Sequence, residues 1–154
     1  MFLWRISLFA DLAGLGAEYA DGRWHTASGG KRVVYLAEHP AVALIENIAN
    51  LSGEPSFFSD EFQLLKIVAP ESVLVKELTP AQLSRIDPEK VEVTQAIGDD
   101  WLADRSSALL RVPSVPSPES WNYILNPLHP DAGELKVEWA KRIAYDKRLF
   151  HLKG

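Results

Sequence analysis

Hydrophobic and polar residues change their spacing along the chain, and the spacing predicts short strands mixed with a few helices. Phe2, Trp4, Ile6 and Leu8 alternate with other residues, which predicts a strand with one buried face. The β-rich run at 33–37 predicts a central strand. The same reasoning predicts further strands at 62–69, 72–78, 91–96, 108–112 and 135–139.

Helical spacing is clearest after Pro40, a residue that suits the first turn of a helix because no N–H is needed there. An apolar stripe follows, made of Val42, Ile45, Ile48 and Ala49. A second, short helix is predicted at 99–105, with Asp99 or Asp100 as its N-cap. Many short strands without a regular βαβ alternation predict an α+β fold.

The composition is that of one globular domain covering residues 1–154. The length allows roughly two-thirds of the unfolded surface to be buried, and 47% hydrophobic with 24% charged residues argues against global disorder. The absence of cysteine excludes disulfides and thiolate catalysis and fits a reducing compartment. Arg5 interrupts the apolar start, and no apolar run approaches the roughly 20 residues of a membrane span. We therefore expect a cytoplasmic location.

Charge and motif content exclude several functions. A net charge of −5 argues against direct binding of nucleic acid, which usually requires clustered Lys and Arg. The one basic cluster, Lys141-Arg142 with Lys147-Arg148, is interpreted as a solvated surface. The histidines lack HxH or HExxH spacing, so no metal is expected, and no glycine-rich motif for binding phosphate is present.

Glu46 is the strongest candidate for a catalytic residue. On a helix that starts near Pro40, it lies about 40° around the axis from Val42, at the edge of the apolar stripe. A carboxylate at that edge is placed where a cleft meets solvent. An exposed glutamate without a role is the competing interpretation, since most glutamates are solvated.

Other candidates lie in glycine-rich and proline-rich segments. Arg23 follows Gly22, and a guanidinium there can bind phosphate through paired hydrogen bonds, although stacking on Trp24 or pairing with Asp21 is equally open. Arg5 is the second candidate for the same role. Tyr35 is either a core aromatic or the wall of a pocket. Three further candidates to brace a ligand site are Ser114, Asn126 and His129, of which the last two also suit ordinary turns.

Three blocks of the chain resemble the RES-domain proteins, toxins of bacterial toxin–antitoxin pairs named for an Arg, a Glu and a Ser. The blocks are the segment 22–51 with YLAEHPAVALIE inside it, VPS at 112–114 and NYILNPLHP at 122–130. WRIS at 4–7 also resembles the family pattern, and the resemblance runs from about Trp4 to Leu149. The segment WHTASGGKR after Arg23 is longer and more basic than that pattern.

The resemblance implies a compact α+β body similar to the ADP-ribosylating toxins, with a cleft between two small sheets. It implies NAD⁺ as substrate and cleavage of the bond between nicotinamide and ribose. Glu46 would then stabilise the ribosyl cation, Arg23 or Arg5 would bind the pyrophosphate, Tyr35 would border nicotinamide, and Ser114 would orient ribose or Glu46. Asn126 and His129 would brace the pocket.

The acceptor of the ADP-ribose stays open. Water or phosphate makes the protein an NAD⁺ glycohydrolase or phosphorylase, which we favour, whereas a protein side chain makes it a mono-ADP-ribosyltransferase. A module that binds a nucleotide or a partner without turnover is the alternative of another class. The resemblance also implies a cognate Xre-type antitoxin, whose C-terminal segment we expect to block the site.

Overall fold

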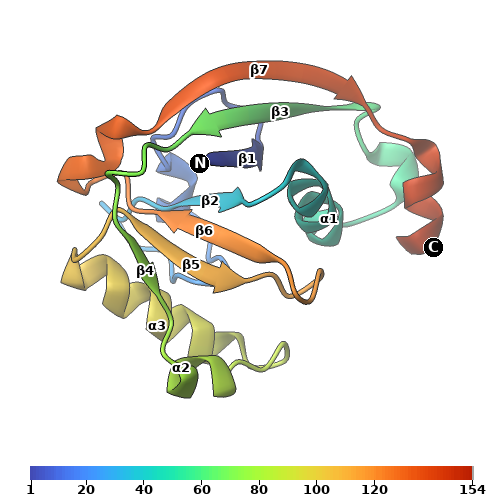
Figure 1. The fold of residues 1–154 in the computed structure, drawn as a ribbon. Coiled ribbons are helices and arrows are strands. Elements are labelled where there is room, and N and C mark those ends of the chain that lie inside the picture. Colours follow the sequence, from blue (N-terminus) through green and yellow to red (C-terminus); the bar gives the residue numbers. More distant parts are fainter. Residues whose placement is uncertain (154) are drawn as a thin grey trace.

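Seven strands dominate the computed structural model, which describes residues 1–153 (Figure 1). They run in the order β4-β5-β6-β2-β1-β3-β7 and are antiparallel except for the β4–β5 pair. Their bounds are β1 Phe2–Ile6, β2 Val34–Ala37, β3 Glu61–Val68, β4 Val75–Glu77, β5 Leu109–Pro113, β6 Trp121–Leu125 and β7 Lys136–Ala144. With the helices, they confirm the predicted α+β class.

The ladder between β1 and β2 is the shortest in the sheet, with Trp4 and Ala37 as its paired residues. On one side of this junction β1, β3 and β7 form long ladders, and on the other side β2 pairs with β6 and β6 with β5. The expectation of separate small sheets was wrong in this respect, because the β1–β2 pairing joins all seven strands. Figure 1 shows the two halves bending apart around this junction.

Two α-helices pack against the sheet, α1 Pro40–Asn50 and α3 Val91–Asp104, whereas the short α2 Pro80–Ser84 buries none of its residues. Short 3-10 helices complete the described chain: η1 Leu15–Glu18, η2 Pro55–Phe57, η3 Pro130–Glu134 and η4 Lys147–Lys153. Pro40 is at the start of α1 as predicted, and the His39 side chain caps the helix by accepting a hydrogen bond from the Ala41 N–H at 3.1 Å. The sequence therefore determines where α1 begins.

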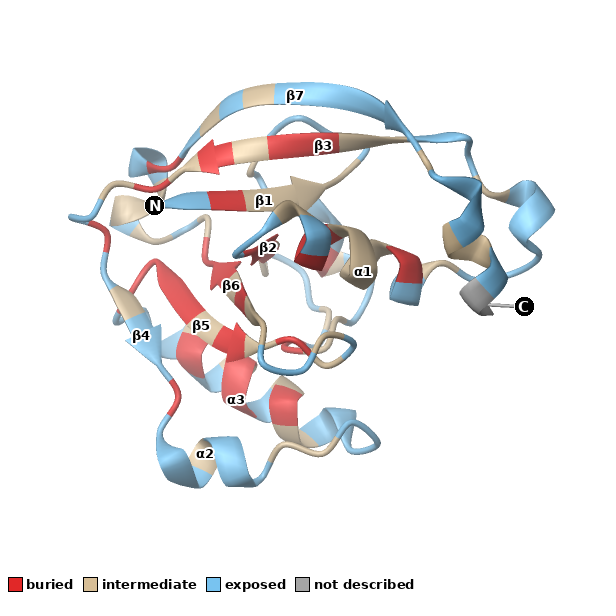
Figure 2. Cartoon of the chain, turned by 45° about the vertical axis from the view of Figure 1, so that its right-hand side comes forward, coloured by how far each residue is buried: buried red, intermediate tan, exposed pale blue. Residues whose placement is uncertain are grey.

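Side chains of β2 divide the core between the two faces of the sheet. Val34 and Leu36 pack with Leu3, Leu65 and Leu125 in the largest apolar cluster. Val33, directly before β2, packs in a different cluster with α3, and Ala37 packs under α1. Figure 2 shows buried residues concentrated in the central strands and along the sheet-facing side of α3, whereas the edge strand β7 is largely exposed.

The strand predicted at 91–96 was wrong, because those residues form the first half of α3. β-branched residues made the segment look strand-like, but the buried positions follow a helical spacing: Thr94, Ile97, Gly98 and Trp101. Asp99 lies inside this helix rather than at its N-cap, and its carboxylate accepts hydrogen bonds from Thr26 and Lys31. α3 is thereby connected to the segment that carries Arg23.

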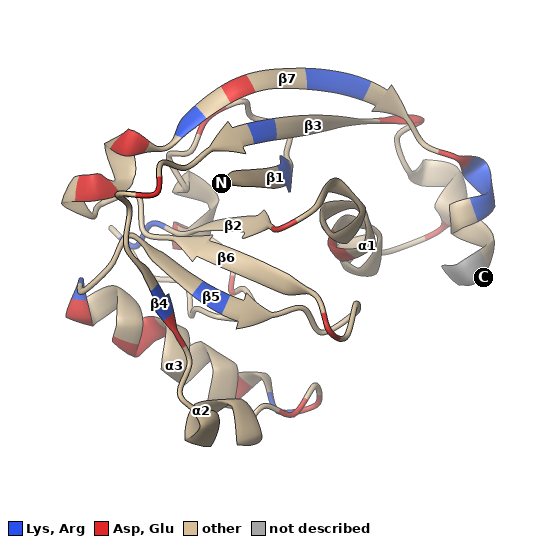
Figure 3. Cartoon of the chain, viewed as in Figure 1, with Lys and Arg blue, Asp and Glu red and all other residues tan. Residues whose placement is uncertain are grey.

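The basic cluster is exposed, as interpreted from the sequence. Lys141 and Arg142 lie on β7, and Lys147 and Arg148 lie on η4 (Figure 3). Arg148 forms an ion pair with Asp146 at 2.6 Å. Among the described residues, no helix combines the length and the apolar character that crossing a bilayer would require.

Candidate functional site

A cavity of about 520 Å³ opens where α1 packs beside β1 and β2. This volume is within the range of about 300–1,000 Å³ that small-molecule sites occupy. Its walls come from β1, the segment 21–24, β2, α1, the loop after β5, and β6. Four residues proposed from the sequence line it: Arg5, Arg23, Tyr35 and Glu46.

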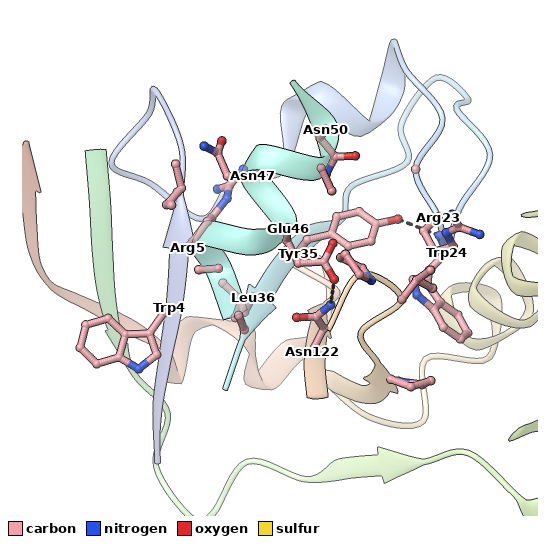
Figure 4. Close-up of a pocket in the computed structure, with 18 of the residues that line it drawn as sticks. Trp4, Arg5, Arg23, Trp24, Tyr35, Leu36, Glu46, Asn47, Asn50 and Asn122 are labelled. Atoms are coloured by element: carbon pink, nitrogen blue, oxygen red, sulfur yellow. Dashed lines mark hydrogen bonds between the residues drawn. The ribbon is translucent and has the colours of Figure 1, made fainter. Parts of the chain in front are cut away.

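Glu46 is half-buried on α1, at the centre of the cavity wall (Figure 4). Its Oε1 accepts two hydrogen bonds, one from the Ser114 hydroxyl at 2.8 Å and one from Asn122 Nδ2 at 2.6 Å. Within the described part of the chain, Oε2 has no hydrogen-bond partner. One carboxylate oxygen is therefore held by the protein while the other remains able to accept from a ligand.

Ser114 is buried directly after β5 and acts as a support for Glu46. Its backbone N–H donates to Ser120 O at 2.9 Å, and its hydroxyl oxygen accepts from the Ser117 N–H at 3.2 Å. Because the hydroxyl proton is donated to Glu46, Ser114 is arranged to orient the carboxylate rather than to attack a substrate. This is the contact with Glu46 that the sequence suggested.

Tyr35 is the centre of a second network on the wall formed by β2. Its hydroxyl accepts a hydrogen bond from the Trp24 N–H at 3.1 Å and lies 2.7 Å from His25 Nδ1. His25 Nε2 lies 3.0 Å from the carbonyl oxygen of Ala20, so it must donate, and in neutral His25 Nδ1 then accepts from Tyr35. Burial raises the pKa of Tyr35, which keeps the phenol neutral.

Gly22 allows this network to form beside the cavity. A Cβ on Gly22 would lie 2.3 Å from the Tyr35 hydroxyl and 2.7 Å from His25 Nδ1. Because glycine has no side chain, the segment 22–25 can pack directly against β2. Arg23 is placed by this close packing.

The two arginines lie on different sides of Glu46 in Figure 4. Arg5 Nη1 donates to the carbonyl of Asp11 at 3.0 Å, and Arg23 Nη1 donates to the carbonyl of Pro88 at 3.0 Å. Burial lowers the pKa of Arg5, although nearby Asp11 opposes this shift. A guanidinium has five N–H donors, so each arginine retains donors for an anionic ligand.

Asn126 and His129 do not line the cavity, so the prediction that they brace it was wrong. Asn126 follows the end of β6, and its side-chain oxygen accepts from the Leu128 N–H at 3.0 Å. His129 caps η3 by accepting from the Asp131 N–H at 3.0 Å. Both therefore shape the turn after β6, which explains the Asn-Pro and His-Pro pairs that mark it.

The sequence interpretation missed Asn122. It lies near the start of β6, in the proline-rich segment where no strand was predicted, and its amide contacts Glu46. An available signal was the polar side chain within WNYIL, because asparagine is depleted in strands.

Asn47 was also missed. It lines the cavity beside Glu46, and its amide donates a hydrogen bond to the Tyr145 hydroxyl. Tyr145 is in turn packed against Phe62 and Phe150, with ring centroids 4.7 and 5.1 Å away. The C-terminal region thus supports the helix that carries Glu46.

These groups can bind an anionic ligand and stabilise positive charge within one cavity. Arg5 and Arg23 supply cationic donors, and Glu46 supplies an anion whose orientation is fixed. Among the described residues, no three His, Cys, Asp or Glu side chains cluster as metal ligands would.

Comparison with known proteins gives one consistent family. The family model described as RES domain matches residues 2–148. A protein named Toxin Res from Pseudomonas putida is 39% identical over 97% of this chain and 100% of its own length. A protein named Prs ADP-ribosylating toxin, from Sphingobium sp. (strain YBL2), is 35% identical over 95% of this chain and 94% of its own.

A solved structure has the same fold. It is a chain of the M. tuberculosis MbcT–MbcA toxin–antitoxin complex, with a TM-score of 0.70 and 17% sequence identity. The match covers 98% of this chain and 87% of that one. At this identity the likeness concerns the fold.

Proposed function

Because the chain belongs to the RES domain family of toxins, we propose that it consumes NAD⁺ by cleaving the bond between nicotinamide and ribose. The observation that carries this proposal is the carboxylate of Glu46. Its Oε1 is held by two side-chain donors, inside a cavity that two arginines also line.

The chemistry requires little acid catalysis. Nicotinamide already carries a positive charge in NAD⁺, so the C1′–N bond breaks with its electron pair going to the ring nitrogen, which becomes neutral. Positive charge then develops on the ribosyl centre, and a fixed carboxylate in a water-poor cavity stabilises it. Glu46 has this role, and its Oε2 also accepts from a ribose hydroxyl.

The remaining side chains bind and orient NAD⁺. Arg23 binds the pyrophosphate through charge-assisted hydrogen bonds, and Arg5 is the second candidate for the same anion. Tyr35 borders the nicotinamide end with its ring, while its hydroxyl stays engaged with His25 and Trp24. Ser114 acts through Glu46.

Water or inorganic phosphate is the acceptor that we favour. Either one forms the new bond to C1′ and loses a proton, so the products are free nicotinamide and ADP-ribose or its 1″-phosphate. A protein side chain is the second candidate, because one relative of similar length is named an ADP-ribosylating toxin. That alternative makes the protein a mono-ADP-ribosyltransferase.

Control by a cognate antitoxin is part of the proposal. An enzyme that drains NAD⁺ from the cytoplasm in which it is made must be inhibited there, and the solved structure of similar fold comes from a toxin–antitoxin complex. We propose an Xre-type partner whose C-terminal segment enters the cavity and contacts Arg23 through a carboxylate. DNA binding then belongs to the partner, in keeping with the net charge of −5.

The test is an incubation of the pure protein with NAD⁺, with and without phosphate, followed by measurement of nicotinamide release. A parallel incubation with labelled NAD⁺ in cell extract detects modified protein. Release in the pure system supports glycohydrolase or phosphorylase activity, and release only with extract, together with labelled protein, supports the transferase. No release in either system contradicts NAD⁺ cleavage and favours a binding module.

A further inference from the structure

Asn122 occupies an unusual position for its residue type. It lies in β6, paired with Val112 of β5 on one side and Ala37 of β2 on the other, and only 9% of it is exposed. Its neighbours in these strands are largely apolar. A polar side chain at a central strand position requires a specific reason.

The two ends of the Asn122 amide have different environments. Nδ2 donates to Glu46 Oε1 at 2.6 Å, whereas Oδ1 is buried without a partner among the described residues. Exchanging the two ends would place Oδ1 against a carboxylate oxygen, which also accepts hydrogen bonds, so the contact with Glu46 determines the orientation. A buried acceptor without a donor destabilises a fold, and an apolar residue of the same shape avoids that penalty.

We propose that Asn122 is a positioning residue for Glu46, retained at a cost to stability. The inference rests on the proposed function of Glu46. One donor alone would allow the carboxylate to turn about a single contact. Two donors from different segments, Ser114 after β5 and Asn122 in β6, fix its plane and direct Oε2 to the substrate.

This role predicts which kinetic parameter a substitution of Asn122 changes. A correctly oriented carboxylate matters most when positive charge develops on the ribosyl centre, and less when NAD⁺ first binds. Loss of the Asn122 donor should therefore lower kcat more than it changes KM. A purely structural role would instead lower stability and leave the kcat of the folded fraction intact.

The first test is Asn122→Leu, which has nearly the same shape. We expect kcat for nicotinamide release to fall about 10- to 150-fold, the rate equivalent of one hydrogen bond to a charged group, with little change in KM. The melting temperature should be unchanged or higher, because the unpaired acceptor is removed. A kcat within about twofold of wild type overturns the proposal.

Asn126→Leu is the matched control. Asn126 is also buried, but its side-chain oxygen accepts from a backbone N–H and it does not line the cavity. This variant should show the opposite pattern, a lower melting temperature with kcat preserved. Equal losses of kcat in the two variants would overturn the positioning role.

Asn122→Asp provides a test that does not depend on the stability of the leucine variant. Two carboxyl groups in close contact raise one apparent pKa of the pair. Below that pKa the pair shares a proton and restores a hydrogen bond to Glu46, and above it two anions repel. The kcat of this variant should fall as pH rises through the raised pKa, while wild type shows no such step. Parallel profiles would contradict the proposal.

Growth arrest on expression distinguishes a failure of the proposed NAD⁺ chemistry from a failure of the positioning role of Asn122. If the wild-type protein arrests growth but releases no nicotinamide, the proposed NAD⁺ chemistry is wrong. Asn122 is then judged by the arrest itself, which Asn122→Leu should relieve and Asn126→Leu should not. Arrest by the folded Asn122→Leu protein at wild-type strength would overturn the inference.

Discussion

Glu46 is held by contacts that do not depend on its charge. In a Glu46→Gln variant the amide oxygen can still accept from Ser114 and Asn122, so the fold should be preserved while the negative charge is lost. We expect nicotinamide release to fall at least about a hundredfold, the scale of removing one transition-state stabiliser. Steady-state kinetics with circular dichroism checks this. A folded variant with near wild-type turnover would contradict the assignment.

Kinetics can also distinguish the roles of Arg23 and Arg5. Both line the cavity, and each guanidinium is bonded to a backbone carbonyl on its own side. Arg23→Ala should raise KM for NAD⁺ more than it lowers kcat, because a phosphate contact acts on ground state and transition state together. Arg5→Ala measured in parallel is the comparison. If only Arg5→Ala raises KM, Arg5 binds the pyrophosphate.

Among the structural elements, α3 determines where the Arg23 segment lies. A Cβ on Gly98 would lie 1.7 Å from the carbonyl oxygen of Trp24, so only glycine permits this contact. Replacing a helical glycine by alanine normally stabilises a helix by about 1 kcal/mol. Gly98→Ala should instead lower the free energy of unfolding by about 1–3 kcal/mol, because the clash is with backbone.

Denaturant unfolding measures this effect, and Gly133→Ala is the control because a Cβ there meets nothing within 4 Å. KM for NAD⁺ should rise in Gly98→Ala, since displacement of α3 also displaces Arg23. If Gly98→Ala instead raises the free energy of unfolding, the close contact between α3 and the Trp24 carbonyl is contradicted.

For the whole molecule, the proposed function makes the cavity the place where NAD⁺ and the antitoxin segment compete. Expression of the protein alone should arrest growth, and co-expression of its cognate antitoxin should restore it. Removing the last residues of the antitoxin should restore toxicity, because the segment that fills the cavity is lost. Growth curves with binding measurements check this. If trimmed antitoxin still inhibits fully while NAD⁺ reaches the site, inhibition must act through distortion of the fold.

The sequence by itself determined the features that depend on local spacing and local chemistry. The alternation at Phe2, Trp4 and Ile6 located β1, and Pro40 located the start of α1. The buried face predicted for β1 was wrong, because Leu3 is fully buried whereas Phe2 and Leu8 are 51% and 92% exposed. Once the start of α1 was known, helical periodicity placed Glu46 at the edge of the buried face, where the structure also has it. The inferences that succeeded each depend on the geometry of one element alone.

Only the tertiary structure decided the features that depend on pairing between distant segments. The residues at 91–96 suit either a strand or a helix, and packing against Trp24 selects the helix. The segment NYILN contains two asparagines, Asn122 and Asn126, and the sequence does not show which of them contacts Glu46. The register of β6 with Ala37 places Asn122 beside α1 and leaves Asn126 in a turn, roughly 13 Å further along the strand direction. The local Asn-Pro pair could mark Asn126 as a turn residue, but register is set by contacts across the sheet, so no local pattern could place Asn122 beside Glu46.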